Sequence, residues 1–320
     1  MKRGRLIIAA TTLLLILEGA GRAAQPFLAP GASEGKQPPT TFRSGVDLVR
    51  IAAVVRDRNG HFVQDLAARD FEVLDNGRPR SITDFRRDLT GVSIALLFDV
   101  SGSMEGHLDA ARESATHTLS WLESRDEAAV FTFDTRLVES APFTAGLKTL
   151  PDSMTTIVPF GETSLHDAIA ATARRVDARE GRRRAVVVLT DGADNASRLS
   201  PDHVASIASA IDVPVYILGV VPSIDNPSAD TATNSVERSA FAGPLADLAS
   251  ATGGHVFVVS TPAQRSLAAR QVVDELRHQY LIAFESSGEP GWHPLVIRAR
   301  QKNLVVRARN GYMAGHPVGL

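Results

Sequence analysis

The 320-residue chain contains no cysteine. Disulfide bonds, thiolate metal sites, cysteine nucleophiles and cysteine-linked lipid anchors are therefore excluded. The charge is nearly balanced at a formal net value of −2, so we expect no nucleic-acid partner. The sequence also lacks the phosphate-binding loop Gly-x-x-x-x-Gly-Lys-Ser/Thr and the zinc pair His-Glu-x-x-His. These absences disfavour a P-loop enzyme and a zinc hydrolase.

The first 24 residues have the composition of an export signal. Three basic side chains occupy the first five positions, an apolar stretch covers residues 6–17, and the small residues Ala23 and Ala24 follow. This order is typical of a secretory signal peptide. About 12 apolar residues are fewer than the roughly 20 that a membrane span needs. We therefore expect cleavage, no stable membrane span afterwards, and an exported protein in the periplasm or outside the cell. An uncleaved membrane anchor is the alternative interpretation.

The composition divides the rest of the chain into parts. Alternating apolar residues and Asn-Gly turns indicate β-strands on both sides of a longer α/β region. An isolated two- or three-stranded piece is only marginally stable, so we expect the two β-rich segments to pair, with the α/β region inserted between them. The predicted parts are a signal peptide (1–24), a flexible linker (25–44), a β-rich segment (45–89), the α/β domain (90–278), a second β-rich segment (279–314) and a tail (315–320).

The region from 90 to 278 alternates between apolar runs and helical patterns. The predicted strands are 92–99, 128–134, 184–191, 214–221 and 255–260, and the predicted helices are about 107–122, 164–177, 201–210, 244–252 and 262–279. Continuous apolar strands separated by helices are typical of a mostly parallel sheet covered on both faces. The predicted fold is therefore a doubly wound α/β domain. Residues 222–240 are rich in Ser, Asn, Asp and Pro and are predicted to form a surface insertion.

Hydroxyl and carboxylate side chains follow the ends of two predicted strands. Asp99, Ser101 and Ser103 come directly after the first strand, at positions i, i+2 and i+4. Oxygen donors of this kind suit a small divalent cation such as Mg²⁺. Asp191 ends another strand, and Thr163 precedes a helix. Because ligands of open α/β sheets bind at the carboxyl ends of the strands, these five residues are predicted to form a metal site. Helix capping and turn formation are the alternative roles.

These residues together resemble the von Willebrand factor type A (VWA) domain and its metal-ion-dependent adhesion site, over about residues 90–278. The resemblance implies a Rossmann-like fold in which Ser101 and Ser103 bind the ion directly. It implies that Thr163 binds directly or through water, and that Asp99 and Asp191 orient water and balance charge. The implied ion is Mg²⁺, with Mn²⁺ or Ca²⁺ as alternatives. One coordination position stays open for a Glu or Asp of a protein ligand.

The flanking segments extend the resemblance. The run Asp70-Phe71-Glu72-Val73-Leu74-Asp75-Asn76-Gly77 and the ending Asn310-Gly311-Tyr312 look like a bacterial exported VWA-related family, so that the resemblance runs from about Val46 to Tyr312. The expected function is non-enzymatic: metal-dependent protein–protein interaction or cell adhesion. One alternative is a structural component of an envelope assembly with a weak or vestigial metal site. The other is a metal-assisted hydrolase, whose general base by sequence would be Glu105, Glu162 or His166.

Two further polar groups have simple interpretations. Asp194 and Asn195 follow the second strand-end aspartate and are predicted to form a polar turn, with a second ion site as the alternative. The arginine runs at 174–175 and 182–184 lie at a helix end and in the connection after it. Basic side chains at the C-terminal end of a helix interact favourably with the helix dipole. These arginines are therefore expected to form a solvated face, with a patch for an anionic partner as the alternative.

Overall fold

The computed structural model describes residues 48–87, 91–179, 182–210, 212–221 and 241–314. The predicted signal peptide, the linker, the insertion at 222–240 and the tail lie outside these ranges. Residues Gly45–Leu320 form one compact unit, which is the part considered below. No helix within the described ranges is both long enough and apolar enough to cross a membrane.

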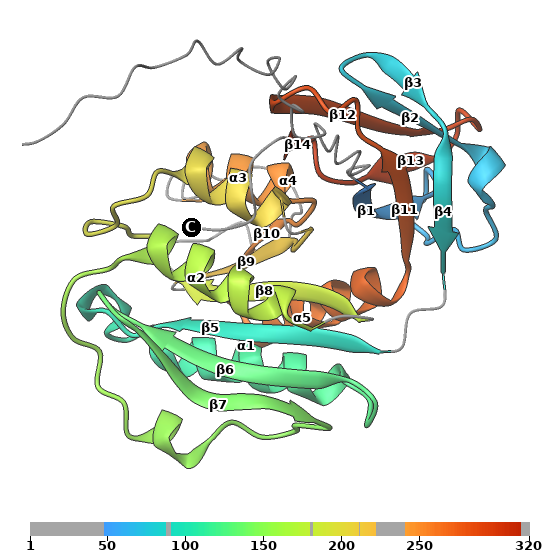
Figure 1. Cartoon of the computed structure of the whole chain (residues 1–320). Coiled ribbons are helices and arrows are strands. Elements are labelled where there is room, and N and C mark those ends of the chain that lie inside the picture. Colours follow the sequence, from blue (N-terminus) through green and yellow to red (C-terminus); the bar gives the residue numbers. More distant parts are fainter. Residues whose placement is uncertain (1–47, 88–90, 180–181, 211, 222–240, 315–320) are drawn as a thin grey trace, which may run out of the picture. The chain divides into compact units, whose positions relative to one another are not determined.

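A six-stranded sheet with the order β10-β9-β8-β5-β6-β7 forms the centre of the α/β region (Figure 1). Five strands run parallel, and β7 pairs antiparallel with β6 at one edge. The described strands of this sheet are β5 (Val92–Asp99), β6 (Glu127–Phe133), β7 (Leu137–Ala145), β8 (Arg183–Thr190), β9 (Val215–Val220) and β10 (Val256–Val259). Every residue of β5, β6 and β9 is buried, which is why these strands read as continuous apolar runs.

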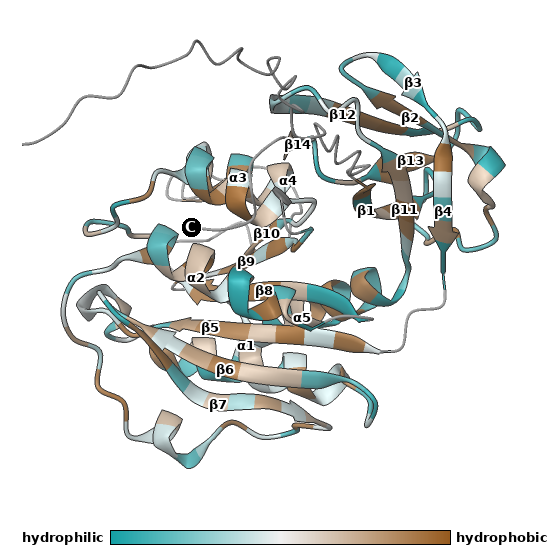
Figure 2. Ribbon diagram, in the orientation of Figure 1, coloured by the Kyte–Doolittle hydropathy of each residue, from teal (hydrophilic) through white to brown (hydrophobic). Residues whose placement is uncertain are grey.

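Five helices cover the two faces of this sheet. Successive side chains of a strand point to opposite faces. Accordingly, Leu96 and Phe98 of β5 belong to one apolar core and Leu97 to the other. The first core lies under α1 and α5, and the second lies under α2, α3 and α4 (Figure 2). The helices are α1 (Leu108–Trp121), α2 (Leu165–Asp177), α3 (Pro201–Ala210), α4 (Pro244–Ala251) and α5 (Pro262–Arg277). The predicted fold, a doubly wound and mostly parallel α/β sheet, is confirmed.

Strands from before and after the α/β region pair with each other. β1 lies between β11 and β13, and β2 pairs with β12. The two resulting sheets have the orders β13-β1-β11-β4 and β14-β12-β2-β3, and they share one apolar core that includes Phe71, Tyr280 and Phe284. The strands are β1 (Leu48–Arg56), β2 (Phe71–Asp75), β3 (Arg78–Arg80), β4 (Ile82–Arg86), β11 (Gln279–Glu285), β12 (Gly291–Ala299), β13 (Val305–Arg307) and β14 (Gly311–Ala314). Segments far apart in the sequence thus build one small β-domain.

A polar network is buried inside this β-domain. Asp75 is fully buried, and its carboxylate accepts a hydrogen bond from Arg80 Nε at 3.0 Å. The imidazole of His293 lies 2.9 Å from Asp75 Oδ1, donates from Nε2 to the carbonyl of Glu289 at 2.7 Å, and stacks on the ring of Tyr312. Burial alone lowers the pKa of His293, but the hydrogen bonds to Asp75 and Glu289 outweigh it and raise the pKa above its usual value.

We expect the free energy of unfolding to fall as the pH rises through the native pKa of His293. The native pKa exceeds the unfolded value of about 6.5, so the contribution of the charged imidazole is complete below that pH and is lost above the native pKa. Urea unfolding between about pH 6 and pH 9 should show a steeper loss for the wild type than for His293→Gln. The exposed His61→Gln is the matched control and should follow the wild type. Equal slopes for the wild type and His293→Gln would contradict the prediction.

Candidate metal centre

Asp99 is the last residue of β5 and is fully buried. Its Oδ1 accepts hydrogen bonds from Ser101 N at 3.0 Å and Ser101 Oγ at 2.6 Å. Its Oδ2 accepts one from Thr190 Oγ1, at the end of β8, at 2.7 Å. One carboxylate therefore fixes the loop after β5 and joins the ends of two neighbouring strands.

The two serine hydroxyls lie side by side. Ser101 is buried, whereas Ser103 is exposed in the short 3₁₀ helix η2 (Gly102–Met104). The Ser101 Oγ and Ser103 Oγ atoms are 3.1 Å apart. Two adjacent ligands of an octahedral Mg²⁺ at 2.0–2.1 Å are separated by about 2.9 Å, so this spacing fits the edge of such an octahedron. The fully buried Met104 fixes the end of this turn in the core.

Backbone contacts bring the loop of Thr163 to the same place. Gly102 N donates to Gly161 O at 3.0 Å, and an added side chain at Gly102 would lie 3.3 Å from that oxygen. Gly161 has a φ of 86°, which a glycine adopts without strain. Thr163 is buried, and its N–H donates to Asn195 Oδ1 at 2.8 Å, while its carbonyl accepts from Asn195 N at 3.1 Å. Thr163 is thus held between the loops that follow β5 and β8.

Asp191 follows β8 directly and supplies a second carboxylate. It is partly exposed, and its Oδ1 accepts a hydrogen bond from Ala193 N at 3.0 Å. Burial raises the pKa of Asp99 to about 6, and the negative charge of Asp191 acts in the same direction. Ionisation of Asp99 is therefore less favourable than that of an ordinary carboxyl group, and a positive charge close to it would favour ionisation. The largest influences on this pKa in the described part of the chain are burial, the hydrogen bonds from Ser101 and Thr190, and the charge of Asp191.

The five predicted ligands occupy the carboxyl end of the central sheet. Hydrogen bonds link Asp99 to Ser101 and Ser101 to Ser103. Thr163 lies in the loop before α2, and Asp191 lies directly after β8. Within the described part of the chain, no group of three or more His, Asp or Glu side chains could hold an ion. The donor set that the structure offers a cation is therefore mixed, with neutral hydroxyls beside carboxylates. Such a set suits a hard, oxygen-seeking ion.

Two residues that shape this site, Thr190 and Asn195, were not among the predicted ligands. Thr190 donates its hydroxyl to Asp99 and accepts a hydrogen bond from Gly192 N at 3.0 Å. It lies inside an apolar strand, where a threonine is expected for its β-propensity alone. Asn195 holds Thr163 through its side-chain amide. The only local signal for both was their closeness in sequence to Asp191.

Asp194 has a structural role of its own. Its carboxylate accepts a hydrogen bond from His166 N at the start of α2, at 2.9 Å, and another from Ser197 N at 3.1 Å. It also lies 2.5 Å from His166 Nδ1. These bonds, with those of Asn195, are the bonds of a polar turn that fastens the loop after β8 to α2.

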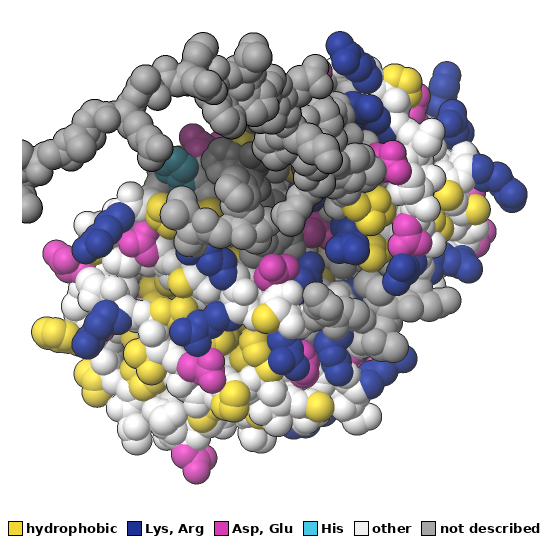
Figure 3. Space-filling model, in the orientation of Figure 1, with side chains coloured by type: hydrophobic (Ala, Val, Ile, Leu, Met, Phe, Trp, Pro, Cys, Tyr) yellow, Lys and Arg dark blue, Asp and Glu magenta, His cyan; other side chains and the backbone are white. Residues whose placement is uncertain are grey.

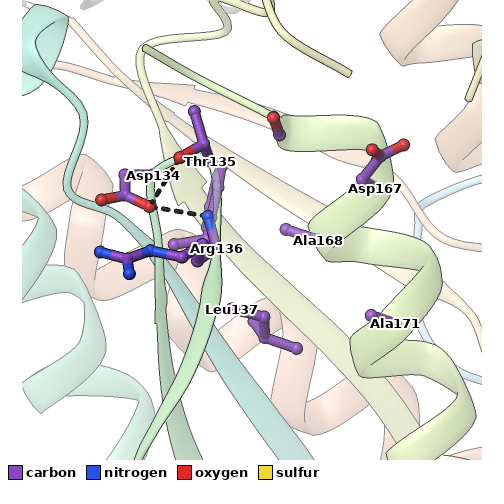
Figure 4. Close-up of a pocket in the computed structure, with 9 residues that line it drawn as sticks. Asp134, Thr135, Arg136, Leu137, Asp167, Ala168 and Ala171 are labelled. Atoms are coloured by element: carbon purple, nitrogen blue, oxygen red, sulfur yellow. Dashed lines mark hydrogen bonds between the residues drawn. The ribbon is translucent and has the colours of Figure 1, made fainter. Parts of the chain in front are cut away.

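A small pocket of about 160 Å³ adjoins the candidate metal centre. It opens between the turn after β6 and the first two turns of α2, and Figure 4 shows Asp134 and Arg136 on one side and Asp167 on the other. Ser164, next to Thr163, lines it and donates its N–H to Asp134 O at 2.9 Å. Ala168 and other small or apolar side chains complete the lining.

The arginine-rich surface on the other side of α2 is largely neutralised. Arg179 forms two hydrogen bonds with Glu127, at 2.6 and 2.7 Å. Arg175 pairs with Glu139 at 3.0 Å. On the part of the face that Figure 3 shows in colour, basic and acidic side chains are interspersed. The expected solvated face describes these arginines better than a patch for an anionic partner.

The fold and the donor set define an α/β domain with a candidate cation site at the carboxyl end of its sheet. Residues 94–193 match the family profile of the von Willebrand factor type A domain. This range includes all five predicted ligands. This part of the chain is a VWA domain, as the motifs predicted. No curated protein matches the sequence significantly.

Several solved structures are similar to this chain. An aerotolerance-related membrane protein from Bacteroides fragilis has 21% identity and a TM-score of 0.45, over 58% of this chain and 98% of its own. A von Willebrand factor type A protein from Catenulispora acidiphila has 14% identity and a TM-score of 0.46, over 85% of this chain and 75% of its own. Proximal thread matrix protein 1 of the mussel byssus, with a zinc-occupied MIDAS motif, has 20% identity and a TM-score of 0.43, over 63% of this chain and 50% of its own.

Proposed function

We propose that this protein is an exported, non-enzymatic binding protein. It holds a divalent cation, Mg²⁺ in the first place and Mn²⁺ or Ca²⁺ as alternatives, at Asp99, Ser101, Ser103, Thr163 and Asp191. It binds a protein ligand through an acidic residue that completes the coordination of the ion. The observation that carries the proposal is the pair of hydroxyls 3.1 Å apart beside the buried carboxylate of Asp99.

The charges at the site support a dependence of ligand binding on the ion. Acidic residues outnumber basic ones across residues 90–278, and Asp99 and Asp191 lie at the site itself. Without an ion, these carboxylates repel an approaching acidic side chain. Neutral hydroxyl ligands leave most of the ion's charge uncompensated, so the bound ion reverses the repulsion and attracts the acid. Ion and ligand are therefore expected to bind together.

The local geometry favours binding over hydrolysis. One of the three candidate general bases is His166, whose Nδ1 lies 2.5 Å from Asp194. Burial lowers the pKa of His166, although Asp194 and Asp167 counteract this. The other ring nitrogen, Nε2, is buried and has no hydrogen-bond partner in the described part of the chain. A base has to reach the proton that it accepts, and Nε2 is enclosed instead of facing a substrate. The proposal is therefore a binding protein without a catalytic step.

Arrays of synthetic peptides test this function without knowledge of the natural partner. Each peptide carries one central Glu in a random sequence, and its matched partner carries Gln. We expect binding of a subset of the Glu peptides in Mg²⁺, with at least a tenfold loss in EDTA, in the Gln partners and in Ser103→Ala. Asp109→Asn is the matched control, because Asp109 is exposed on α1 and pairs only with Arg112. Equal binding in Mg²⁺ and EDTA, or no Mg²⁺-dependent binding at all, would contradict the proposal.

A further inference from the structure

Two large apolar side chains beside the candidate metal centre are almost fully exposed. Val158 is 80% exposed and Phe160 is 82% exposed, the highest values among the exposed large hydrophobic residues of the described chain. They lie between the short helix η3 (Asp152–Thr155) and α2. Isolated exposed apolar residues are common on protein surfaces. Here, however, two such residues, an aromatic one and a valine, lie two positions apart next to a candidate binding site.

The backbone that carries these side chains is fastened at both ends. Phe160 N donates to Val100 O at 3.0 Å, in the loop that holds the predicted ligands Asp99 and Ser101. On the other side, Arg112 donates to the carbonyls of Met154 at 2.8 Å and Ile157 at 3.2 Å. The side chain of Met154 is fully buried in the core under α1. The exposure of the two side chains is therefore a property of an anchored loop.

We infer that Val158 and Phe160 form an apolar contact site for the same protein ligand, beside the ion. The ligand segment then presents an acidic residue next to a large apolar one. This inference rests on the function proposed above. The ion alone recognises any accessible carboxylate, so it cannot select one partner among many acidic surfaces. Val158 and Phe160, on an anchored loop beside the ion, supply that selection by contacting an apolar residue of the ligand. They also exclude water from the contact between the ion and the acidic residue of the ligand.

The charges near the ion restrict the ligand in the same direction. Glu162 adjoins Thr163, Glu105 follows the η2 turn, and both are exposed. A second acidic residue directly beside the coordinating one would meet these carboxylates and be repelled. An apolar neighbour meets no such repulsion and finds Val158 and Phe160. Because the backbone that carries both side chains is held by hydrogen bonds, little backbone entropy is lost when the ligand binds.

The test is a second peptide array, in which every peptide carries one Glu and only the two flanking positions vary among Leu, Phe, Ser and Asp. The wild type in Mg²⁺ is expected to prefer Leu or Phe over Ser by about tenfold and to reject Asp. The double variant Val158→Ser/Phe160→Ser should lose this preference while still binding the Ser-flanked Glu peptide. Its thermal stabilisation by Mg²⁺ should equal that of the wild type. Leu267→Ser, on α5 and 56% exposed, is the matched control and should keep the preference.

Four outcomes would overturn the inference, and the first three separate it from the function on which it rests. Mg²⁺-dependent binding of Glu peptides without any flank preference would leave the proposed function standing and remove the apolar contact. The same conclusion follows if the double variant keeps the wild-type preference. Sedimentation that shows self-association of the wild type, abolished in the double variant, would assign the apolar pair to a second copy of the chain. If no peptide binds in Mg²⁺ at all, the proposed function fails and the inference fails with it.

Discussion

Replacement of Asp99 by Asn is expected to remove the stabilisation that Mg²⁺ gives the wild-type protein. An ion that binds only the native state stabilises it by about 2.7 kcal/mol at a concentration one hundred times the Kd. Asn lacks the charge that balances the ion, but it retains the shape of Asp and an oxygen that accepts the bonds from Ser101. Thermal unfolding in EDTA, Mg²⁺, Mn²⁺ and Ca²⁺ should show a raised midpoint for the wild type only.

A second prediction concerns the stability of the Asp99→Asn variant in the absence of ions. Burial raises the pKa of Asp99 to about 6, so at neutral pH the ionised carboxylate costs free energy in the ion-free native state. Asp99→Asn removes that cost and is expected to be at least as stable as the wild type in EDTA. Asp109→Asn controls for the loss of one negative charge and should keep the full response to Mg²⁺. Equal stabilisation of Asp99→Asn and the wild type, or no response of either to any cation, would identify the Asp99–Ser103 turn as scaffold and favour the structural-component alternative.

Glu275→Gln is expected to give the largest loss of stability in the ion-free protein. Glu275 lies on α5 and is 3% exposed. Its carboxylate accepts hydrogen bonds from Arg56 Nη2 at 3.1 Å and from Arg307 Nη2, which belong to β1 and β13. It therefore ties a helix of the α/β region to two strands of the β-domain. Removal of its charge leaves two guanidinium groups without a counter-ion, which we expect to cost about 2 to 4 kcal/mol.

The neighbouring residue supplies a close control for this variant. Asp274 is on the same helix, is partly exposed and pairs only with Arg270, at 3.4 Å. Exposed pairs of this kind contribute about 0 to 1 kcal/mol, so Asp274→Asn should change the free energy of unfolding little. Urea unfolding of the two variants in EDTA measures the difference. A Glu275→Gln protein within about 0.5 kcal/mol of the wild type would show that the buried ion pairs add nothing to the stability.

The strands and helices that the sequence predicted well are those with one dominant pattern. The strand predicted at 92–99 has those bounds in the structure, and that at 184–191 is displaced by one residue. Both are buried, so their composition identifies them without knowledge of the rest of the fold. The helix predicted at 262–279 ends at Arg277, because Gln279 already pairs with Val54 in the β-domain. Tertiary pairing, which no local pattern records, decided that boundary.

The edge strand β7 was not predicted from the sequence. Its residues are partly buried or exposed, and it contains Pro142, which is compatible with a strand only where a backbone donor is not required. It adds an antiparallel strand to a sheet that was predicted from its parallel strands alone. The short strand β14 was missed for a related reason: its four residues carry too little periodicity to be recognised.

The candidate site was predictable only in part. Asp99, Ser101 and Ser103 lie within five consecutive residues, so their proximity follows from the sequence itself. The role of Thr190 depends on the contact between the ends of β5 and β8. The exposure of Val158 and Phe160 was not predictable either, since a loop has no periodic pattern that assigns its apolar side chains to the core or to the surface. It follows from the hydrogen bonds that hold the loop on both sides.

The divided β-domain has a consequence for how the protein is made. Leu48 of β1 pairs with Glu285, and Val54 pairs with Gln279. During synthesis the first strands therefore wait until Gln279–Glu285 has been added, whereas all described strands of the α/β sheet are present once Val259 has been added. The waiting strands expose unpaired edges, which are recognised by proteases and prone to aggregation. Closure of the β-domain thus comes after the α/β sheet is complete, and a chain terminated before β11 leaves the first strands without partners.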